Sequence, residues 1–192
     1  MIVTATEVTI YTDISVSAGT ITSSGLIPIV QERINLITNN YFLARDMYLQ
    51  EDFTFSATAN TITAENSFAE EGFIDGDEIF IYNSYRNDGY YAVDSVSDNV
   101  LTISSAYSLI AEPTARSVYI SVVDWPASIK YVAAQMVKYD YDDRKNATPG
   151  VKSKSLGPYS VSFGESGINA NLYGYPQSII DGLSPYTAVR LV

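Results

Sequence analysis

The sequence predicts an α+β fold in which a small helical bundle is interrupted by an antiparallel β-sandwich or β-barrel insert. Apolar residues recur at helical spacing near both ends of the chain, whereas between residues 51 and 124 they alternate as in strands. The whole net charge of −11 also falls in that middle segment. The predicted domains are therefore a discontinuous helical domain of residues 1–50 and 125–192, and an acidic β-rich insert of residues 51–124.

The N-terminal segment has the spacing of an amphipathic helix. One face of that helix is formed by Leu26, Ile29, Val30, Ile34 and Ile37. Ser24 is suited to the N-cap, and Asn39-Asn40 is suited to end the helix. A shorter helix is predicted near Thr6–Asp13, with residues 19–25 as the loop between the two helices.

The middle segment predicts short strands. Runs rich in β-branched and aromatic residues lie around Phe53, Ile79, Leu101 and Ile120. Turn residues such as Asn87-Asp88-Gly89 separate these runs at intervals of roughly ten residues. This pattern is typical of a small antiparallel sandwich or barrel.

The helical spacing returns after Trp125 and Pro126 and predicts a helix that ends near Arg144. Alternating residues 159–163 predict an extended segment. A short helix is predicted over residues 175–183, followed by an extended tail.

Composition excludes several kinds of chemistry. The 192 residues include neither Cys nor His, which excludes disulfides, zinc sites with those ligands, and Ser-His-Asp catalysis. The excess of 22 acidic over 11 basic residues disfavours a protein that grips nucleic-acid phosphates. The first residues lack the pattern of a signal peptide, and no stretch is apolar enough to span a membrane. We therefore expect no membrane partner.

The charge is concentrated in the insert. Residues 51–124 include thirteen acidic and two basic residues, whereas the rest of the chain has nine of each. In that neutral remainder, Arg144, Lys145, Lys152 and Lys154 form a basic cluster, which is either a solvated loop or a contact for an acidic partner. Tyrosines gather in the last third of the chain and weakly favour a subunit interface.

The acidic residues of the insert allow two chemical hypotheses. Glu70, Glu71, Asp75, Asp77 and Glu78 could include the carboxylate pair of a glycosidase, or the turn at Asp75 could be a calcium loop. No pattern fixes two carboxylates across a cleft, and the calcium motif stops after the turn. We interpret these residues as solvated loops and a hairpin turn, and predict that the chain is not an enzyme and has no cofactor.

Two motifs near the C-terminus resemble a known family. Residues 152–163, Lys-Ser-Lys-Ser-Leu-Gly-Pro-Tyr-Ser-Val-Ser-Phe, are similar to the stretch Ser-Glu-x-Ile-Gly-Asp-Tyr-Ser-Val-x-Tyr of head–tail connector (adaptor) proteins of tailed bacteriophages. Residues 183–186, Leu-Ser-Pro-Tyr, resemble the ending Leu-x-Pro-Tyr of that family. The N-terminal helix and residues 38–42 are similar to the family's early helix and the turn that follows it.

The resemblance implies a structural virion protein, made in the host cytoplasm and located at the neck. It implies a dodecameric ring that binds the portal after DNA packaging, extends the DNA channel and docks the next neck or tail protein. DNA would pass through without sequence-specific binding. The alternative is a tail-completion or virion-surface module that binds a partner or a glycan through its β-insert.

The resemblance also implies roles for particular residues. Portal docking is implied for Leu183, Ser184, Pro185, Tyr186 and Arg190. Subunit contacts or a place near the channel are implied for Arg144, Lys145, Lys152, Lys154, Tyr159 and Phe163. Because twelve acidic inserts around a narrow axis would repel one another, we expect the insert at the outer periphery of the ring.

Overall fold

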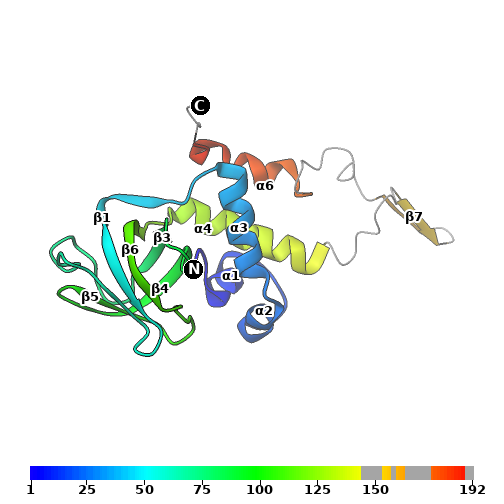
Figure 1. The fold of residues 1–192 in the computed structure, drawn as a ribbon. Helices are drawn as coiled ribbons and strands as arrows, with labels where there is room; N and C mark the ends of the chain where they lie inside the picture. Colours follow the sequence, from blue (N-terminus) through cyan, green and yellow to red (C-terminus); the bar gives the residue numbers. More distant parts are fainter. Residues whose placement is uncertain (144–152, 157–158, 163–173, 189–192) are drawn as a thin grey trace. The chain divides into compact units, whose positions relative to one another are not determined.

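The computed structural model describes residues 1–143, 153–156, 159–162 and 174–188 (Figure 1). The chain divides into two compact units. We call Met1–Asn40 with Trp125–Val192 the helical unit, and Tyr41–Asp124 the barrel unit. None of the described helices combines the length and the apolarity that a membrane span requires.

The predicted fold class, a helical bundle interrupted by a β-insert, is wrong. The described residues form a closed six-stranded antiparallel barrel and five short α-helices. Three of these helices have seven residues or fewer, which is too short to line a bundle core over several turns. The first barrel strand starts at Leu43, within the segment predicted to be helical. The barrel closes around its own core and is therefore a main body of the fold.

The helical unit has short elements of several kinds. In chain order they are α1 (Ala5–Tyr11), α2 (Ala18–Ser24), α3 (Leu26–Thr38), α4 (Ala127–Lys138), the π-helix η1 (Tyr139–Asp143), strands β7 (Ser153–Leu156) and β8 (Tyr159–Ser162), α6 (Gln177–Asp181) and the 3-10 helix η2 (Ser184–Tyr186). The helix α2 replaces the predicted loop of residues 19–25. The predicted helix of residues 175–183 is confined to the five residues of α6.

Local hydrogen bonds explain where the first helices begin and end. The Thr4 side chain accepts from the Glu7 amide, and the Glu7 carboxylate accepts from the Thr4 amide, which is a capping box. Ser24 is the last residue of α2 and does not cap α3, because Gly25, with φ 66°, occupies that position. Asn39 ends α3 in a left-handed conformation with φ 49°.

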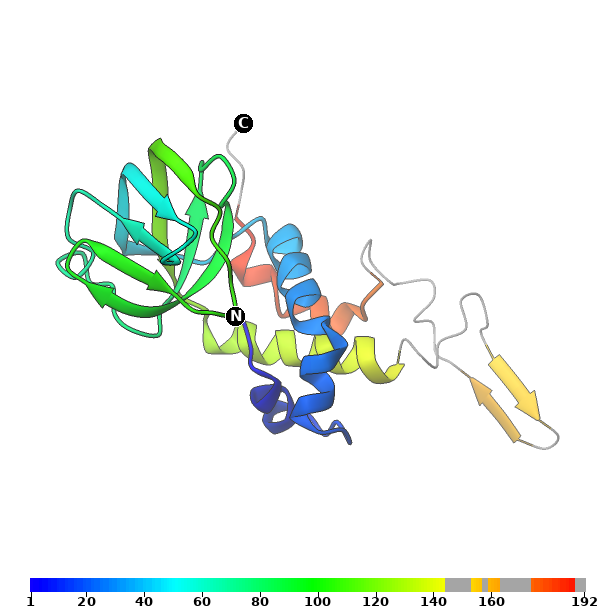
Figure 2. The ribbon, with the colours of Figure 1, turned by 60° about the horizontal axis from the view of Figure 1, so that its bottom comes forward.

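The helix α4 is the centre of the helical unit. It packs against α1, α3 and α6. Figure 2 shows α3, in blue, crossing α4, in yellow-green. The buried side chains of α4 are Ile129, Val132, Ala133, Ala134, Met136 and Val137. Most of them fall at helical spacing on one face, and Ala134 widens the buried side on which α4 meets its neighbours.

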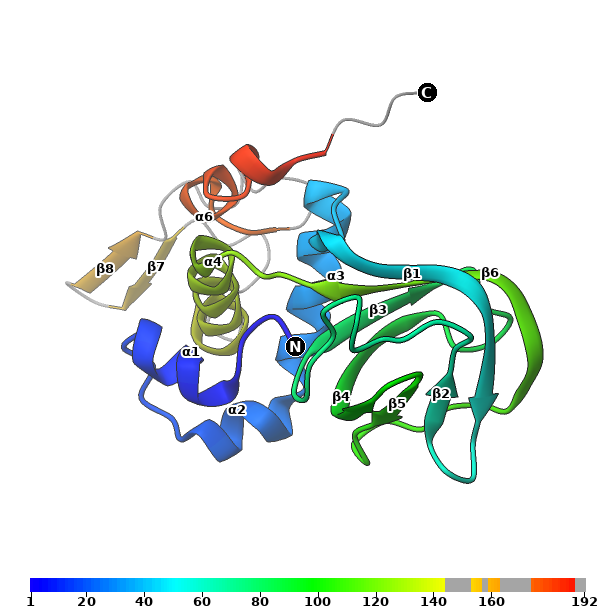
Figure 3. The ribbon, with the colours of Figure 1, turned by 90° about the vertical axis from the view of Figure 1, so that its left-hand side faces the viewer.

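The barrel unit closes through its first and last strands. Its strands are β1 (Leu43–Ser56), β2 (Thr61–Thr63), β3 (Glu78–Tyr82), β4 (Gly89–Ser97), β5 (Val100–Ile103) and β6 (Glu112–Val123). They follow the order β1-β2-β5-β4-β3-β6, and β6 pairs with β1 to complete the ring (Figure 3). The interior is filled by inward side chains such as Phe53, Phe68, Ile79 and Ile120, each fully buried.

A bulge bends β1 along the barrel. Between the pairs Leu43↔Val123 and Tyr48↔Ser121, β1 advances by more residues than β6. The buried Ser121 hydroxyl lies within 3.3 Å of the carbonyl oxygens of Ala44 and Met47 and can donate to either. This serine satisfies part of the backbone that the bulge removes from the strand ladder.

Candidate functional site

The C-terminal motif is partly buried. Leu183 is 1% exposed and belongs to the interior of the helical unit, whereas Ser184 and Pro185 are exposed. Tyr186 is half-buried, and Arg190 lies outside the described residues. Of the residues implied to dock the portal, Ser184 and Pro185 therefore offer the most accessible surface.

Hydrogen bonds hold this motif on the helices of its own unit. The Tyr186 hydroxyl shares a hydrogen bond with Ser128 Oγ at the start of α4, and the Tyr186 carbonyl accepts from Asn40 Nδ2 at 3.2 Å. The Ala188 amide donates to the Thr38 carbonyl at 2.7 Å. The motif is thus attached to the end of α3 and to the start of α4.

Gly182 lets the chain approach α4 closely before the motif begins. A Cβ atom at this position would lie 2.8 Å from Val132 Cγ2. Carbon atoms do not approach so closely without displacement, so only glycine fits here without a shift of either segment.

Of the six residues implied in ring contacts, the structure describes two, Lys154 and Tyr159. Lys154 pairs with Val161, and Tyr159 pairs with Leu156, in the antiparallel hairpin of β7 and β8. The structure therefore brings Lys154 and Tyr159 into one two-stranded sheet. The other members of this set, Arg144, Lys145, Lys152 and Phe163, lie outside the described residues.

A buried polar network joins three segments of the helical unit. Arg33 Nη1 of α3 donates to Asp140 Oδ2 of η1 at 2.6 Å and to the Tyr175 hydroxyl oxygen at 2.5 Å. The Tyr175 hydroxyl in turn donates to Asp140 Oδ2 at 2.6 Å. Tyr175 is fully buried and Asp140 is 7% exposed, whereas the Arg33 side chain is 26% exposed, so the carboxylate of this ion pair is shielded from water and the guanidinium keeps partial access.

The network shifts the ionisation of its members. Burial, and then the hydrogen bond to Asp140, raise the pKa of Tyr175 well above its ordinary value near 10. The pKa of Arg33 is also raised: its burial acts in the opposite direction but is outweighed by Tyr175 and Asp140. The guanidinium carbon lies 5.6 Å from the Tyr175 ring centroid, which adds a cation–π contact. Arg33 lowers the pKa of Tyr175, but burial and Asp140 outweigh it, so the tyrosine stays protonated beside the charged arginine.

This network was not predicted from the sequence. Arg33 and Asp140 are 107 residues apart, and Asp140 and Tyr175 are 35 residues apart. No local pattern signals the contact, although a lone arginine on an otherwise apolar helix face is a weak sign of a partner. The hydrogen bond between Asp140 and Tyr175 joins the two ends of the segment that contains β7 and β8.

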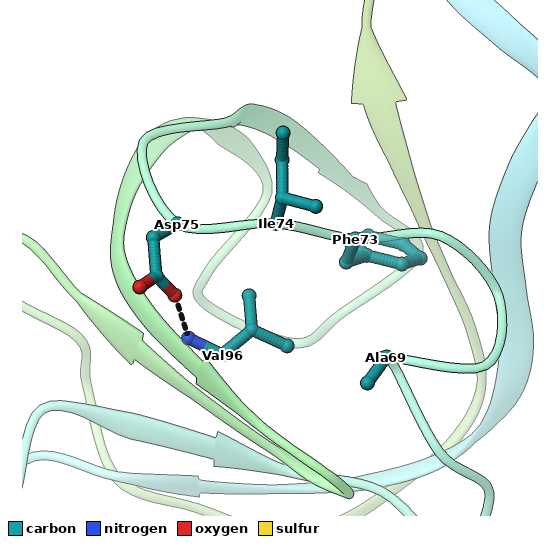
Figure 4. Close-up of a pocket in the computed structure, with 5 residues that line it drawn as sticks. All are labelled: Ala69, Phe73, Ile74, Asp75 and Val96. Carbon is teal, nitrogen blue, oxygen red and sulfur yellow. Dashed lines mark hydrogen bonds between the residues drawn. The ribbon is translucent and has the colours of Figure 1, made fainter.

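Two acidic residues of the barrel, Asp75 and Asp77, accept hydrogen bonds from backbone amides in and beside a turn. Asp75 Oδ1 accepts from the Val96 amide at 2.7 Å, and Asp77 Oδ2 accepts from the Ile74 amide at 2.9 Å. Burial raises the pKa of Asp77, and the Ile74 hydrogen bond opposes this shift. A hollow of about 390 Å³ lies beside this turn. Figure 4 shows the residues that line it, which are Ala69, Phe73, Ile74, Asp75 and Val96.

That hollow lacks the parts of a hydrolytic site. Asp75, the carboxylate in its lining, accepts a backbone hydrogen bond, and the other lining side chains are apolar. Within the described part of the chain, no group of three or more acidic side chains is arranged to hold a metal ion. The arrangement thus stabilises a turn and offers no second acid or base across the hollow.

Comparisons with known proteins identify no family for this chain. No family model matches the sequence, and no curated protein matches it significantly. Among solved structures, the phage phi92 endosialidase is similar at 20% identity with a TM-score of 0.31. The match covers 41% of this chain and 13% of that one, so this chain spans a small fraction of the protein it matches. A TM-score of 0.31 does not establish a common fold.

Proposed function

We propose that this chain is a structural virion protein of a tailed bacteriophage, a head-to-tail adaptor. In this role it assembles as a dodecameric ring under the portal after DNA packaging, at the neck of the particle. The ring extends the DNA channel and docks the next neck or tail protein. Its work is assembly: it makes and breaks no covalent bond and contacts DNA without reading its sequence.

The anchoring of the two adaptor-like motifs is the observation that carries this proposal. The motif of residues 183–186 is fastened to α3 and α4 through Tyr186 and its neighbours. The motif of residues 152–163 belongs to a segment whose two ends are joined by the hydrogen bond between Asp140 and Tyr175. Both motifs are thus attached to the helical unit. An assembly protein needs such a common base for the segments that contact its partners.

Charge supports the same role. The helical unit has eight acidic and eight basic residues, so copies of it can surround an axis without net repulsion. The barrel unit has fourteen acidic and three basic residues. Twelve barrel units near a narrow channel would repel one another and the DNA, so we place them at the periphery of the ring.

Exposed apolar side chains on the helices support ring formation. Ile29 and Leu36 lie two turns apart on one face of α3 and are 42% and 60% exposed. Ile10 of α1 is 70% exposed, and its neighbour Tyr11 contacts the half-exposed Tyr131 of α4 at a ring distance of 6.2 Å. A closed ring needs two different patches that fit each other, and these two are candidates.

Electron microscopy of the particle neck tests the proposal. The expected result is twelve copies of this chain in one ring beneath the portal, with the barrel units on the outside. Many copies on the particle surface, or copies at the far end of the tail, would instead support the surface or tail-completion alternative.

A binding experiment tests the docking segment separately. We expect the full chain to co-sediment with portal rings in a density gradient, and Pro185→Glu to abolish this by placing a charge on the exposed motif. Ser178→Glu, which adds the same charge at another exposed position, on α6, is the matched control and should bind normally. If Pro185→Glu binds as well as the unmodified chain, residues 183–186 are not the portal contact.

A further inference from the structure

Three tyrosines lie side by side on the outside of the barrel. Tyr48 of β1, Tyr119 of β6 and Tyr82 of β3 come from three adjacent strands, shown together in Figure 3. Tyr48 is 43% exposed, Tyr82 is 59% exposed, and Tyr119 is half-buried between them. We call these three side chains the tyrosine face.

Strand register explains why the three side chains lie on one face of the barrel. Tyr82 is directly opposite Tyr119, and Tyr48 is opposite Ser121, two residues further along β6. The rings of Tyr48 and Tyr119 are stacked, with centroids 5.2 Å apart and planes at 26°. Because side chains alternate across a strand, all three point outward while their neighbours fill the core.

Hydrogen bonds hold the backbone beside this face. Ser117, with φ 54°, accepts from Gln50 Nε2 at its hydroxyl and from Asn83 Nδ2 at its carbonyl, both at 3.1 Å. The Ser117 amide donates to Asp52 Oδ1 at 3.0 Å. These contacts link β1, β6 and the end of β3. They therefore stabilise the backbone of the strands that carry the tyrosine face.

We propose that the tyrosine face is a docking surface for a basic protein partner, whose Arg or Lys side chains lie on the three rings. Tyrosine rings attract cations, and Tyr is enriched where proteins bind one another. The barrel unit supplies the complementary charge, with fourteen acidic against three basic residues. Electrostatic attraction therefore draws a basic partner to the barrel, and the exposed rings provide its contact.

The same observations disfavour other occupants. A second barrel unit would bring eleven further negative charges, and nucleic acid would also be repelled. A saccharide needs amide or carboxylate groups that converge on its hydroxyls. Here the amide groups of Gln50 and Asn83 already donate to Ser117. The proposal concerns the barrel unit and does not depend on the adaptor function.

Nuclear magnetic resonance of the ¹⁵N-labelled full chain tests the proposal, with tetra-arginine amide as the probe. We expect saturable shifts centred on Tyr48, Tyr82 and Tyr119, weaker binding by tetra-lysine, and none by tetra-glutamate. Replacing all three tyrosines by Ser should weaken tetra-arginine binding about tenfold or more. The changes are on exposed positions, and dispersed amide signals will establish that the variant is folded.

A matched variant, one further probe and a concentration series give the outcomes that would oppose the proposal. Tyr131→Ser removes a tyrosine of similar exposure from α4 and should leave binding unchanged. The proposal is overturned if tetra-arginine does not bind, if its shifts spread equally over Glu70 and Glu71, or if the triple variant binds normally. It is also overturned if maltohexaose shifts these amides instead, or if the chain self-associates through them at rising concentration.

Discussion

Replacing Tyr175 by Phe removes one hydroxyl from the buried network and leaves the ring in place. That hydroxyl accepts from Arg33 at 2.5 Å and donates to Asp140 at 2.6 Å. Hydrogen bonds to charged groups contribute about 1.5–3 kcal/mol, and Asp140 keeps its bond to Arg33, so we expect a loss of about 2 kcal/mol. With a usual urea dependence, this lowers the unfolding midpoint of the helical unit by roughly 1 M.

Tryptophan fluorescence measures this change in the right unit. Trp125 is the only Trp of the chain, is 8% exposed, and belongs to the helical unit. Tyr131→Phe, on the surface of α4, is the control and should change stability by less than about 0.5 kcal/mol. If Tyr175→Phe unfolds at the same urea concentration as the unmodified chain, the hydroxyl does not stabilise the helical unit and our reasoning fails.

Alkaline pH gives an independent test of the same hydroxyl. An unfolded tyrosine loses its proton near pH 10, whereas burial and Asp140 raise the pKa of Tyr175 in the folded chain. Above pH 10 the folded state therefore binds the extra proton, so stability falls as the pH rises from about 10 towards the folded pKa. Tyr175→Phe should show a flatter decline by Trp125 fluorescence. A parallel decline in both proteins would contradict this assignment.

Two further substitutions test close contacts elsewhere. Gly182→Ala places a Cβ 2.8 Å from Val132 and should destabilise the helical unit by about 1–3 kcal/mol in urea unfolding, whereas Gly19→Ala, whose Cβ would make only an ordinary contact at 3.8 Å with Ser17 Oγ, should not. Glu112→Gln should destabilise the barrel unit by about 1–3 kcal/mol in thermal unfolding followed by near-ultraviolet circular dichroism, because the buried Glu112 carboxylate accepts from the amides of Tyr85 and Arg86. An effect no larger than that of the exposed Glu70→Gln would show that neither amide depends on this carboxylate.

The elements that could be predicted have local signals. The helix α3 follows from its apolar spacing and from the asparagine at its end, both within a few turns of chain. The predicted face is only partly right, because Val30 and Ile34 are buried whereas Ile29 is 42% exposed. The helix α2 was missed because residues 18–24 are mostly Ser, Thr, Ala and Gly and carry no apolar stripe. Its N-cap, Ser17, accepts from the Thr20 amide and was the available signal.

The sequence left the choice between a sandwich and a closed barrel open for a physical reason. Alternation between residues 51 and 124 indicates strands, but it does not say whether the outer strands meet. Closure depends on β1 pairing with β6, for example Leu49 with Ile120, across about seventy residues of chain. The start of β1 was also hidden, because the bulge before Tyr48 disturbs the alternation that would reveal a strand.

By itself, the sequence determined the absence of Cys and His chemistry, the acidic character of the middle segment, and the periodicity of the longer helices. These are properties of composition and of neighbours in the chain. Only the tertiary structure decided that the barrel closes, that Arg33 meets Asp140 and Tyr175, and that three tyrosines form one face. Each of these features depends on the register and packing of distant segments, which local spacing does not encode.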